Sequence, residues 1–183
     1  GDGKIVGATV QGIFKGKRGQ PGEKIGTFQK DEILCGTVTR NTKLGIFGRL
    51  QKPLVNISFQ EPIPVATIDQ IHEGPAEMLT VLKGDKVEKF NLEIVRINPK
   101  AKEDGKGLVI QVSDPGLLQE TGGIIQGMSG SPIIQDGRLV GAVTHVFIND
   151  PTKGYGVPAE WMLREGDLFP AKEEVIENLL KTG

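Results

Sequence analysis

Glycine and proline divide the chain into short apolar runs, and this division constrains the fold more than any other feature. The 183 residues include 26 glycines and 11 prolines, whereas only 5% are aromatic. Short apolar or β-branched runs bounded by such residues are typical of strands joined by tight turns. In the segment AEMLTVLKGDKVEKFNLEIVRI, two such runs flank residues 83–86, and Phe90, Leu92 and Ile94 alternate with polar residues. We therefore expect an all-β domain.

The expected strands are distributed between residues 4 and 146, and one helix follows them. A second hairpin is predicted to turn at Asp136-Gly137. Only the segment Lys172–Leu180 has a helical period, with its apolar residues on one stripe and most of its charged residues opposite. Outside the first hairpin, the expected strands are Lys4–Phe14, Ile25–Gln29, Ile33–Thr39, Leu44–Leu50, Gly107–Val112, Pro132–Gln135 and Arg138–Val146.

Charge and residue usage exclude several classes of function. Lys and Arg (22) nearly balance Asp and Glu (23), so the chain lacks the basic excess that nucleic-acid binding needs. The basic loop Lys15–Lys24 does not match a phosphate-binding loop. Two histidines and one cysteine argue against a zinc site, and Cys35 is expected to be a small core residue. We therefore expect no nucleic acid, no metal and no cofactor.

The segment GMSGSP (residues 127–132) has the features of a serine nucleophile on a tight turn. Gly127 can adopt backbone angles closed to other residues, so its N–H and that of Ser129 can point into one oxyanion hole. Gly130 leaves room for an acyl group, and the strand Arg138–Val146 could hydrogen-bond a bound peptide. A plain Gly/Ser turn is the alternative, and a bare G-x-S-G would not distinguish the two. The longer string, with its following D-G hairpin, favours a serine protease.

The chain resembles the chymotrypsin-like peptidase domain of the sporulation stage IV protein B family. Four blocks carry the resemblance: TKLGIFGRL (42–50), EGPAEMLTVLKGDKVEKFNLEIV (73–95), the long block from SDPGLLQ through GMSGSP to GYGV (113–157), and EWML (160–163). The resemblance implies a trypsin-like double β-barrel with a C-terminal helix. It also implies one serine peptidase domain over residues 1–183, incomplete at its N-terminus.

By the same resemblance, Ser129 matches the nucleophile and Asp114 the acidic member of a catalytic triad. For Asp114 a purely local role stays open, because Ser113–Gly116 also has good turn chemistry. The family's histidine has no match here and is expected upstream of Gly1, so residues 1–183 alone should be catalytically deficient. Thr144 and His145 match the wall of the substrate cleft. His145 as the base is a weaker alternative, and His72 is expected to be a solvated histidine.

The resemblance also implies a biological role and partners. The family consists of exported signalling proteases of sporulation, which act between the two forespore membranes and can cleave themselves. Full-length members have an upstream membrane anchor and a PDZ domain. The expected substrate is a membrane-associated protein that restrains an intramembrane protease, so that cleavage leads to activation of a late sigma factor. The alternative is a non-catalytic protease fold that binds peptides along Arg138–Val146.

Overall fold

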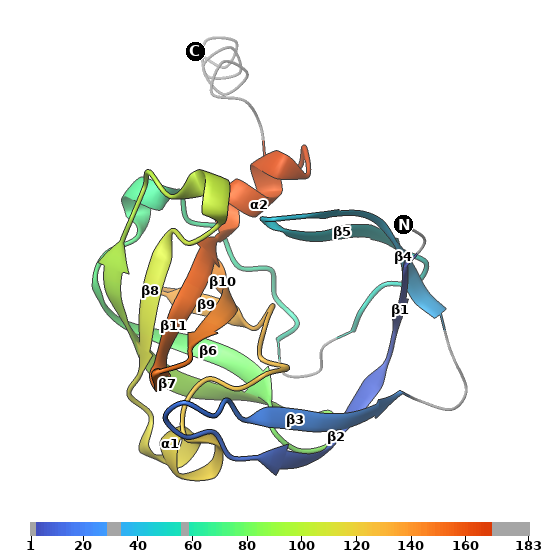
Figure 1. Cartoon of the computed structure of the whole chain (residues 1–183). Coiled ribbons are helices and arrows are strands. Elements are labelled where there is room, and N and C mark those ends of the chain that lie inside the picture. The colour runs from blue at the N-terminus through green and yellow to red at the C-terminus, as the bar shows by residue number, and fades with distance from the viewer. Residues whose placement is uncertain (1–2, 29–33, 56–58, 170–183) are drawn as a thin grey trace, which may run out of the picture.

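The structure, a computed structural model, describes residues 3–28, 34–55 and 59–169. Within these ranges it consists of antiparallel strands and a few short helices (Figure 1). The N-terminal strands are β1 (Gly3–Val6), β2 (Ala8–Phe14), β3 (Glu23–Phe28), β4 (Leu34–Thr42) and β5 (Gly45–Leu50). The later elements are β6 (Gly74–Val81), β7 (Val87–Ile97), β8 (Leu108–Val112), α1 (Pro115–Thr121), β9 (Pro132–Gln135), β10 (Arg138–Phe147), β11 (Asp150–Pro158) and α2 (Ala159–Glu165).

Six strands close into an antiparallel barrel in the order β10-β11-β8-β7-β6-β9. Alternate residues point into it, so that on β8 Leu108, Ile110 and Val112 are buried while the residues between them are partly exposed. Closure gives every strand a neighbour on both sides, although β9 is short and leaves Thr144–Phe147 of β10 without a described partner on that side. The all-β prediction is therefore confirmed. The core is completed by residues that include Met78, Leu92, Ile94, Ile133, Val140 and Val143.

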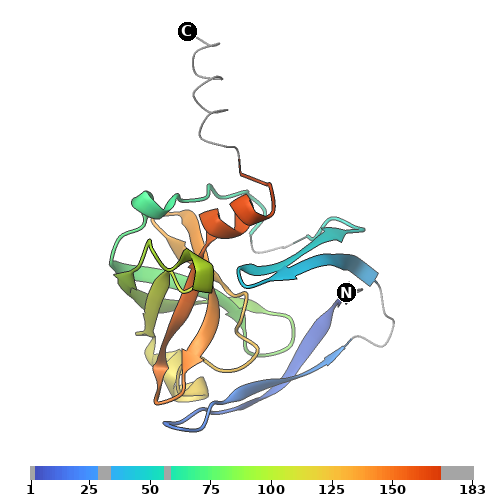
Figure 2. The ribbon, with the colours of Figure 1, turned by 45° about the horizontal axis from the view of Figure 1, so that its top comes forward.

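The N-terminal half forms two separate sheets beside the barrel. β1, β4 and β5 make a three-stranded sheet, whereas β2 and β3 make a two-stranded one. Both views show these sheets extending to one side of the barrel (Figures 1 and 2). β3 is exposed along most of its length, so its sheet has little core of its own. The double barrel expected from the sequence is thus represented, among the described residues, by one closed barrel and these two sheets.

Backbone hydrogen bonds and a small apolar cluster are among the contacts that attach the N-terminal sheets to the barrel. At one end, Val10 of β2 and Gly84 exchange two backbone hydrogen bonds of 2.9 Å. At the other end, the turn between β4 and β5 places Leu44 in a small apolar cluster with Val157 and Trp161. The β4–β5 turn is therefore held against β11 and α2, close to the middle of β10.

The turn predictions are confirmed, and the helix predictions need correction. Val81 and Val87 end the first predicted hairpin, and Asp136-Gly137 turns the second. Neither α1 nor α2 was expected. The segment Ser113–Gly116, for which a local turn was the open alternative, begins α1, because Asp114 caps the helix and proline suits its first position. The predicted strand Lys4–Phe14 is two strands separated by Gly7, and β11 was missed. The helix expected over Lys172–Leu180 lies outside the described residues.

The α2 helix connects the segment before β6 to the barrel. Its buried Glu160 accepts a 2.7 Å hydrogen bond from the Ile68 N–H. The other carboxylate oxygen accepts two hydrogen bonds from Arg164, one turn later. Both oxygens of this buried group are thus satisfied, which a buried carboxylate requires. Within the described ranges, no helix is both long and apolar enough to cross a bilayer.

The barrel core predicts a large difference between two leucines. Leu108 is fully buried, whereas Leu168 is 71% exposed. Leu108→Ala should lower the free energy of unfolding by about 2–5 kcal/mol, because it removes buried apolar atoms and leaves a cavity. Leu168→Ala should change it by less than about 0.5 kcal/mol. Urea unfolding followed by circular dichroism measures both values, and an equal loss in the two variants would contradict the assigned core.

Candidate functional site

A tight loop, residues Gln126–Ser131, connects the region after α1 to β9 and is called the serine loop below. Gly127 and Gly130 have φ values of +95° and +88°, a region that side chains other than glycine rarely occupy. Between them, the Met128 side chain is fully buried in the barrel core. Ser129 is exposed. The two glycines therefore turn the chain so that Met128 anchors the loop inward and Ser129 faces outward.

Hydrogen bonds fix the serine loop against β10. The Ser129 hydroxyl donates to the Thr144 carbonyl at 2.9 Å, and the Gly130 N–H donates to the Val143 carbonyl at 2.8 Å. Among the described residues, the N–H groups of Gly127 and Ser129 donate no hydrogen bond. Two free N–H donors beside one hydroxyl form an arrangement that can hold the oxyanion of an acyl-transfer reaction.

Ser129 lies on the wall of a cavity of about 630 Å³. The barrel side of this cavity is formed by Ser129, Gly130 and residues 142–145 of β10. The opposite side is formed by the β4–β5 turn, residues 42–46, whose Leu44 and Gly45 pack against the end of the barrel and α2. Apolar side chains of Val157 and Met162 and the charged groups of Lys43, Asp104 and Lys106 complete the lining. This cavity is large enough for several side chains of a peptide.

The structure brings the predicted cleft residues to this cavity. Thr144 and His145 both line it together with Ser129. Within the described residues, the His145 imidazole forms no hydrogen bond with the Ser129 hydroxyl, whose partner is the Thr144 carbonyl. The geometry thus places His145 at the cleft wall, as predicted, and does not place it as the base.

Asp114 lies at the start of α1 and is not among the residues that line the cavity. One carboxylate oxygen accepts the Leu117 N–H and the other accepts the Asn91 N–H, both at 3.1 Å. These bonds cap the helix and tie it to β7. The structure therefore gives Asp114 a local role, and its predicted role in orienting an imidazole stays a prediction.

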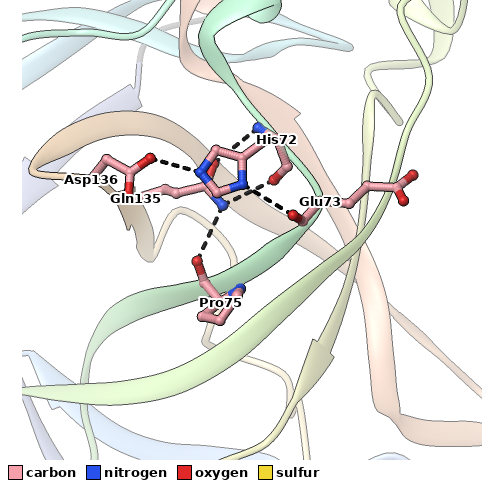
Figure 3. A network of polar contacts seen from close by, with 5 residues as sticks. All are labelled: His72, Glu73, Pro75, Gln135 and Asp136. Carbon is pink, nitrogen blue, oxygen red and sulfur yellow. Dashed lines mark hydrogen bonds and ion pairs between the residues drawn. The ribbon is translucent and has the colours of Figure 1, made fainter.

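His72 belongs to a separate polar network at the far end of β9 from Ser129 (Figure 3). Its Nε2 lies 2.7 Å from Asp136 Oδ2, and its Nδ1 lies 3.0 Å from the Glu73 carbonyl oxygen. The Gln135 side chain accepts the His72 N–H and donates to the His72 and Pro75 carbonyls. All of β9 separates this network from the serine loop, so His72 is not positioned as a base for Ser129.

The hydrogen bonds of His72 favour its charged form. The Glu73 carbonyl and the Asp136 carboxylate both accept, so together they raise the pKa of the imidazole above its usual value. The His72 side chain is exposed, and the network connects the β9–β10 turn to the segment before β6. The His72 network therefore links two surface segments and is not a part of the cavity.

Sequence reasoning missed two contributions to the site. One is the β4–β5 turn, which supplies a wall of the cavity. The other is Lys24 of β3, which contacts the serine loop and donates a hydrogen bond to Thr80. Both approach from segments about 80 or more residues away along the chain, and neither carries a local signal of function. Ser131 was part of the quoted motif, but nothing in the sequence indicated that its side chain bonds to Thr80.

The described residues hold no group of three or more His, Cys, Asp or Glu side chains suited to a metal ion. Cys35 lies partly buried on β4, outside the lining of the cavity, rather than in the core where it was expected.

Comparison with known proteins gives a family match that spans the cavity. A family model described as SpoIVB peptidase S55 matches residues 1–163, which includes the serine loop, Asp114 and the cavity. No curated protein matches the chain.

The His72 network predicts a titration that depends on Asp136. In Asp136→Asn the amide should lower the imidazole pKa, because the negative acceptor is lost, while asparagine still tolerates the φ of +51° at this turn. Because the folded-state pKa is raised, the pair contributes stability below a pH of about 6.5 and loses it as the pH rises through the folded-state value. NMR titration of the imidazole measures the change, and Asp85→Asn, in another turn, serves as the control. An unchanged His72 titration would contradict the pairing.

Proposed function

Because the chain belongs to the SpoIVB peptidase S55 family, we propose that Ser129 is its nucleophile in a signalling endopeptidase of sporulation. The peptidase class follows from the family. The single observation that supports the nucleophile is the exposed Ser129 hydroxyl at the cavity wall, beside two backbone N–H groups that have no other acceptor among the described residues.

The proposed reaction is acyl transfer. The Ser129 oxygen attacks the scissile carbonyl, and the N–H groups of Gly127 and Ser129 hold the oxyanion that forms. In the structure the Ser129 hydroxyl donates to the Thr144 carbonyl, which accepts a hydrogen bond but cannot serve as a proton acceptor at neutral pH. Attack therefore requires the hydroxyl to leave this carbonyl and donate to a base.

The base and its partner are the parts of the proposal that rest on resemblance. We propose that a histidine of an upstream Gly-His segment accepts the Ser129 proton and that Asp114 orients this histidine. To act as the base, this histidine must place its imidazole in the cavity between the serine loop and the β4–β5 turn. Thr42, Leu44 and Ile46 line the cavity on the side of that turn. Until such a base is present, catalysis should rest on the oxyanion hole and on binding alone.

The substrate is proposed to bind as an added strand on β10. β9 pairs with β10 from Arg138 to Ala142, and β11 pairs with its other edge from Gly141 to Phe147. The serine loop occupies the same edge of β10 at Val143, whose carbonyl accepts the Gly130 N–H and whose N–H donates to the Ser131 carbonyl. No described strand pairs with the remaining edge, Thr144–Phe147, which runs away from Ser129. An extended peptide can hydrogen-bond there and pass over Ser129.

The biological substrate is proposed from the family alone. It is a membrane-associated regulator that restrains an intramembrane protease, cleaved in the space between the two forespore membranes. The proposal includes an upstream membrane anchor and PDZ domain in the full-length protein, and self-cleavage. Cleavage of the regulator would release the intramembrane protease and lead to activation of a late sigma factor.

A second candidate function is peptide binding without cleavage. The observation that favours it is that, among the described residues, no imidazole contacts the Ser129 hydroxyl. The two functions differ in one measurement. A fluorophosphonate should form a covalent adduct with Ser129 of the full-length protein if it is a peptidase, and Ser129→Ala should abolish the adduct.

The two turn glycines Gly130 and Gly137 offer a matched test of the role of the serine loop. Both have positive φ, +88° and +70°, and both have open space where a Cβ would stand. Alanine at either position should cost about 1–2 kcal/mol of stability for the same reason, the left-handed backbone. Gly130→Ala should also slow fluorophosphonate labelling of Ser129 in the full-length protein by about tenfold or more, because the loop geometry shifts.

Gly137→Ala, in the turn at the far end of β9, should label at the wild-type rate. Equal labelling of the two variants at equal stability would contradict the assignment of the loop. Mass spectrometry of the adduct gives the labelling rates, and urea unfolding gives the stabilities.

Asp114→Asn separates the catalytic role of Asp114 from its capping role. Asparagine is a good helix cap and can still accept the Leu117 N–H, but its NH2 group cannot accept the Asn91 N–H. The free energy of unfolding should therefore fall by only about 1 kcal/mol. If Asp114 orients the histidine, kcat of the full-length protein should fall by about 10⁴-fold, because a neutral amide selects the wrong tautomer. A wild-type kcat would leave Asp114 with its structural role alone. Peptide hydrolysis by the full-length protein measures this.

A further inference from the structure

Lys24 of β3 contacts the serine loop from the N-terminal half of the chain. Its backbone N–H donates to the Gln126 carbonyl at 2.9 Å, and the Gln126 N–H donates to the Gly22 carbonyl at 2.9 Å. This pair of bonds forms a parallel bridge between the start of β3 and the start of the serine loop. The first residue of the loop is thereby fixed to a segment that is about 100 residues distant in sequence.

The Lys24 side chain continues along the loop. A Cβ added to Gly127 would stand 3.1 Å from Lys24 Cβ and 3.2 Å from its Cγ and Cδ, so the aliphatic stem covers the Cα of Gly127 directly. Because this is the residue whose N–H is proposed for the oxyanion hole, the stem limits how far that peptide unit can move. A side chain at position 127 would therefore have to displace the Lys24 stem slightly, in addition to adopting a φ of +95°.

The ammonium group reaches the other end of the loop. Lys24 Nζ donates to Thr80 Oγ1 at 2.7 Å, and the Ser131 hydroxyl donates to the same oxygen at 3.0 Å. Thr80 and Ser131 are both buried, at 5% and 9% exposure. Breaking a hydrogen bond between buried polar groups is costly, because a group left unpaired in the interior cannot bond to water instead. Thr80 thus connects Lys24 to the last residue of the loop.

A surface lysine ordinarily keeps its ammonium in water. Lys24 is only partly exposed, and burial lowers its pKa to about 8. The chain therefore tolerates the desolvation of one cation at this place. Lys24 contacts the first and second residues of the six-residue serine loop and reaches the last one through Thr80, and this is a physical reason for that cost.

We infer that Lys24 is a positioning residue, which holds the serine loop in the conformation that presents the Gly127 and Ser129 N–H groups. This inference deepens the proposed function and rests on Ser129 being the nucleophile. Lys24 acts from three points at once: its backbone fixes Gln126, its stem covers Gly127, and its ammonium is joined through Thr80 to Ser131. Met128 holds the loop from the core side, and Lys24 holds it from the outer side.

The central test compares three variants of the full-length protein. Lys24→Met keeps an apolar stem and removes the ammonium, Lys24→Ala removes both, and Lys24→Arg keeps both a stem and a cation. We expect the maximal rate of fluorophosphonate labelling at Ser129 to fall by about 10- to 100-fold in Lys24→Met and further in Lys24→Ala. The half-saturating probe concentration should stay within about twofold. Lys24→Arg should recover part of the lost rate.

The control is Lys86→Met, which removes a lysine whose side chain is 77% exposed in the β6–β7 turn. It should label at the wild-type rate. Thr80→Val should resemble Lys24→Met, because it breaks both bonds to Thr80. The double variant Lys24→Met/Ser131→Ala should lose less labelling rate than the product of the two single fold-losses, because both side chains act through Thr80.

A second readout does not depend on catalysis. Hydrogen exchange of the peptide that covers the serine loop should be several-fold faster in Lys24→Met, while peptides from β7 and β8 stay at the wild-type rate. If the wild-type protein is not labelled at Ser129, the proposed function fails, and hydrogen exchange still decides whether Lys24 holds the loop. An exchange rate in the serine loop of Lys24→Met equal to that of the wild-type protein would overturn the inference. A labelling rate of Ser129 in Lys24→Met equal to that of the wild-type protein would also overturn it.

Discussion

The burial of Met128 is the contact on which the geometry of the site depends. A thioether in the closed core of a barrel cannot leave without exposing apolar surface and opening a cavity, so the middle of the serine loop is fixed from within. With Met128 pointing inward, the next residue must point outward, and Ser129 stands on the cavity wall. The glycines on either side supply the backbone angles that this reversal requires. One apolar side chain thereby sets the direction of a polar one.

This arrangement differs from that of the digestive proteases in the residue before the nucleophile. There an acidic side chain pairs with a new N-terminus and shapes the oxyanion hole, whereas Met128 is apolar and has its place in the core without any cleavage. Among the described residues the N–H groups of Gly127 and Ser129 already have no acceptor, so the proposed oxyanion hole does not require such a step. The loop is held instead by core packing on one side and by Lys24 on the other.

The cavity is shared between two parts of the fold with different packing. Its barrel wall, along β10, belongs to a closed sheet with a continuous core. Its other wall, the β4–β5 turn, is held by the small cluster of Leu44, Val157 and Trp161. Fewer buried contacts hold this second wall, so it should open at lower free energy than the barrel. A base or a peptide that enters between the two walls would meet one rigid side and one adaptable side.

The family resemblance, and not a local pattern, indicated Thr144 and His145 as cleft residues. The sequence by itself determined the strand hairpins and the serine loop. These features follow from local rules: turn residues with positive φ at Asp136-Gly137, period-two alternation along β7, and glycines around Ser129. It failed at α1, where capping by Asp114 outweighed the turn chemistry of Ser113–Gly116. Only the tertiary structure decided which distant groups meet at the serine loop. Lys24, Thr80 and the β4–β5 turn come together there because the barrel closes and the N-terminal sheets pack beside it, and no local pattern in the sequence encodes contacts between segments so far apart.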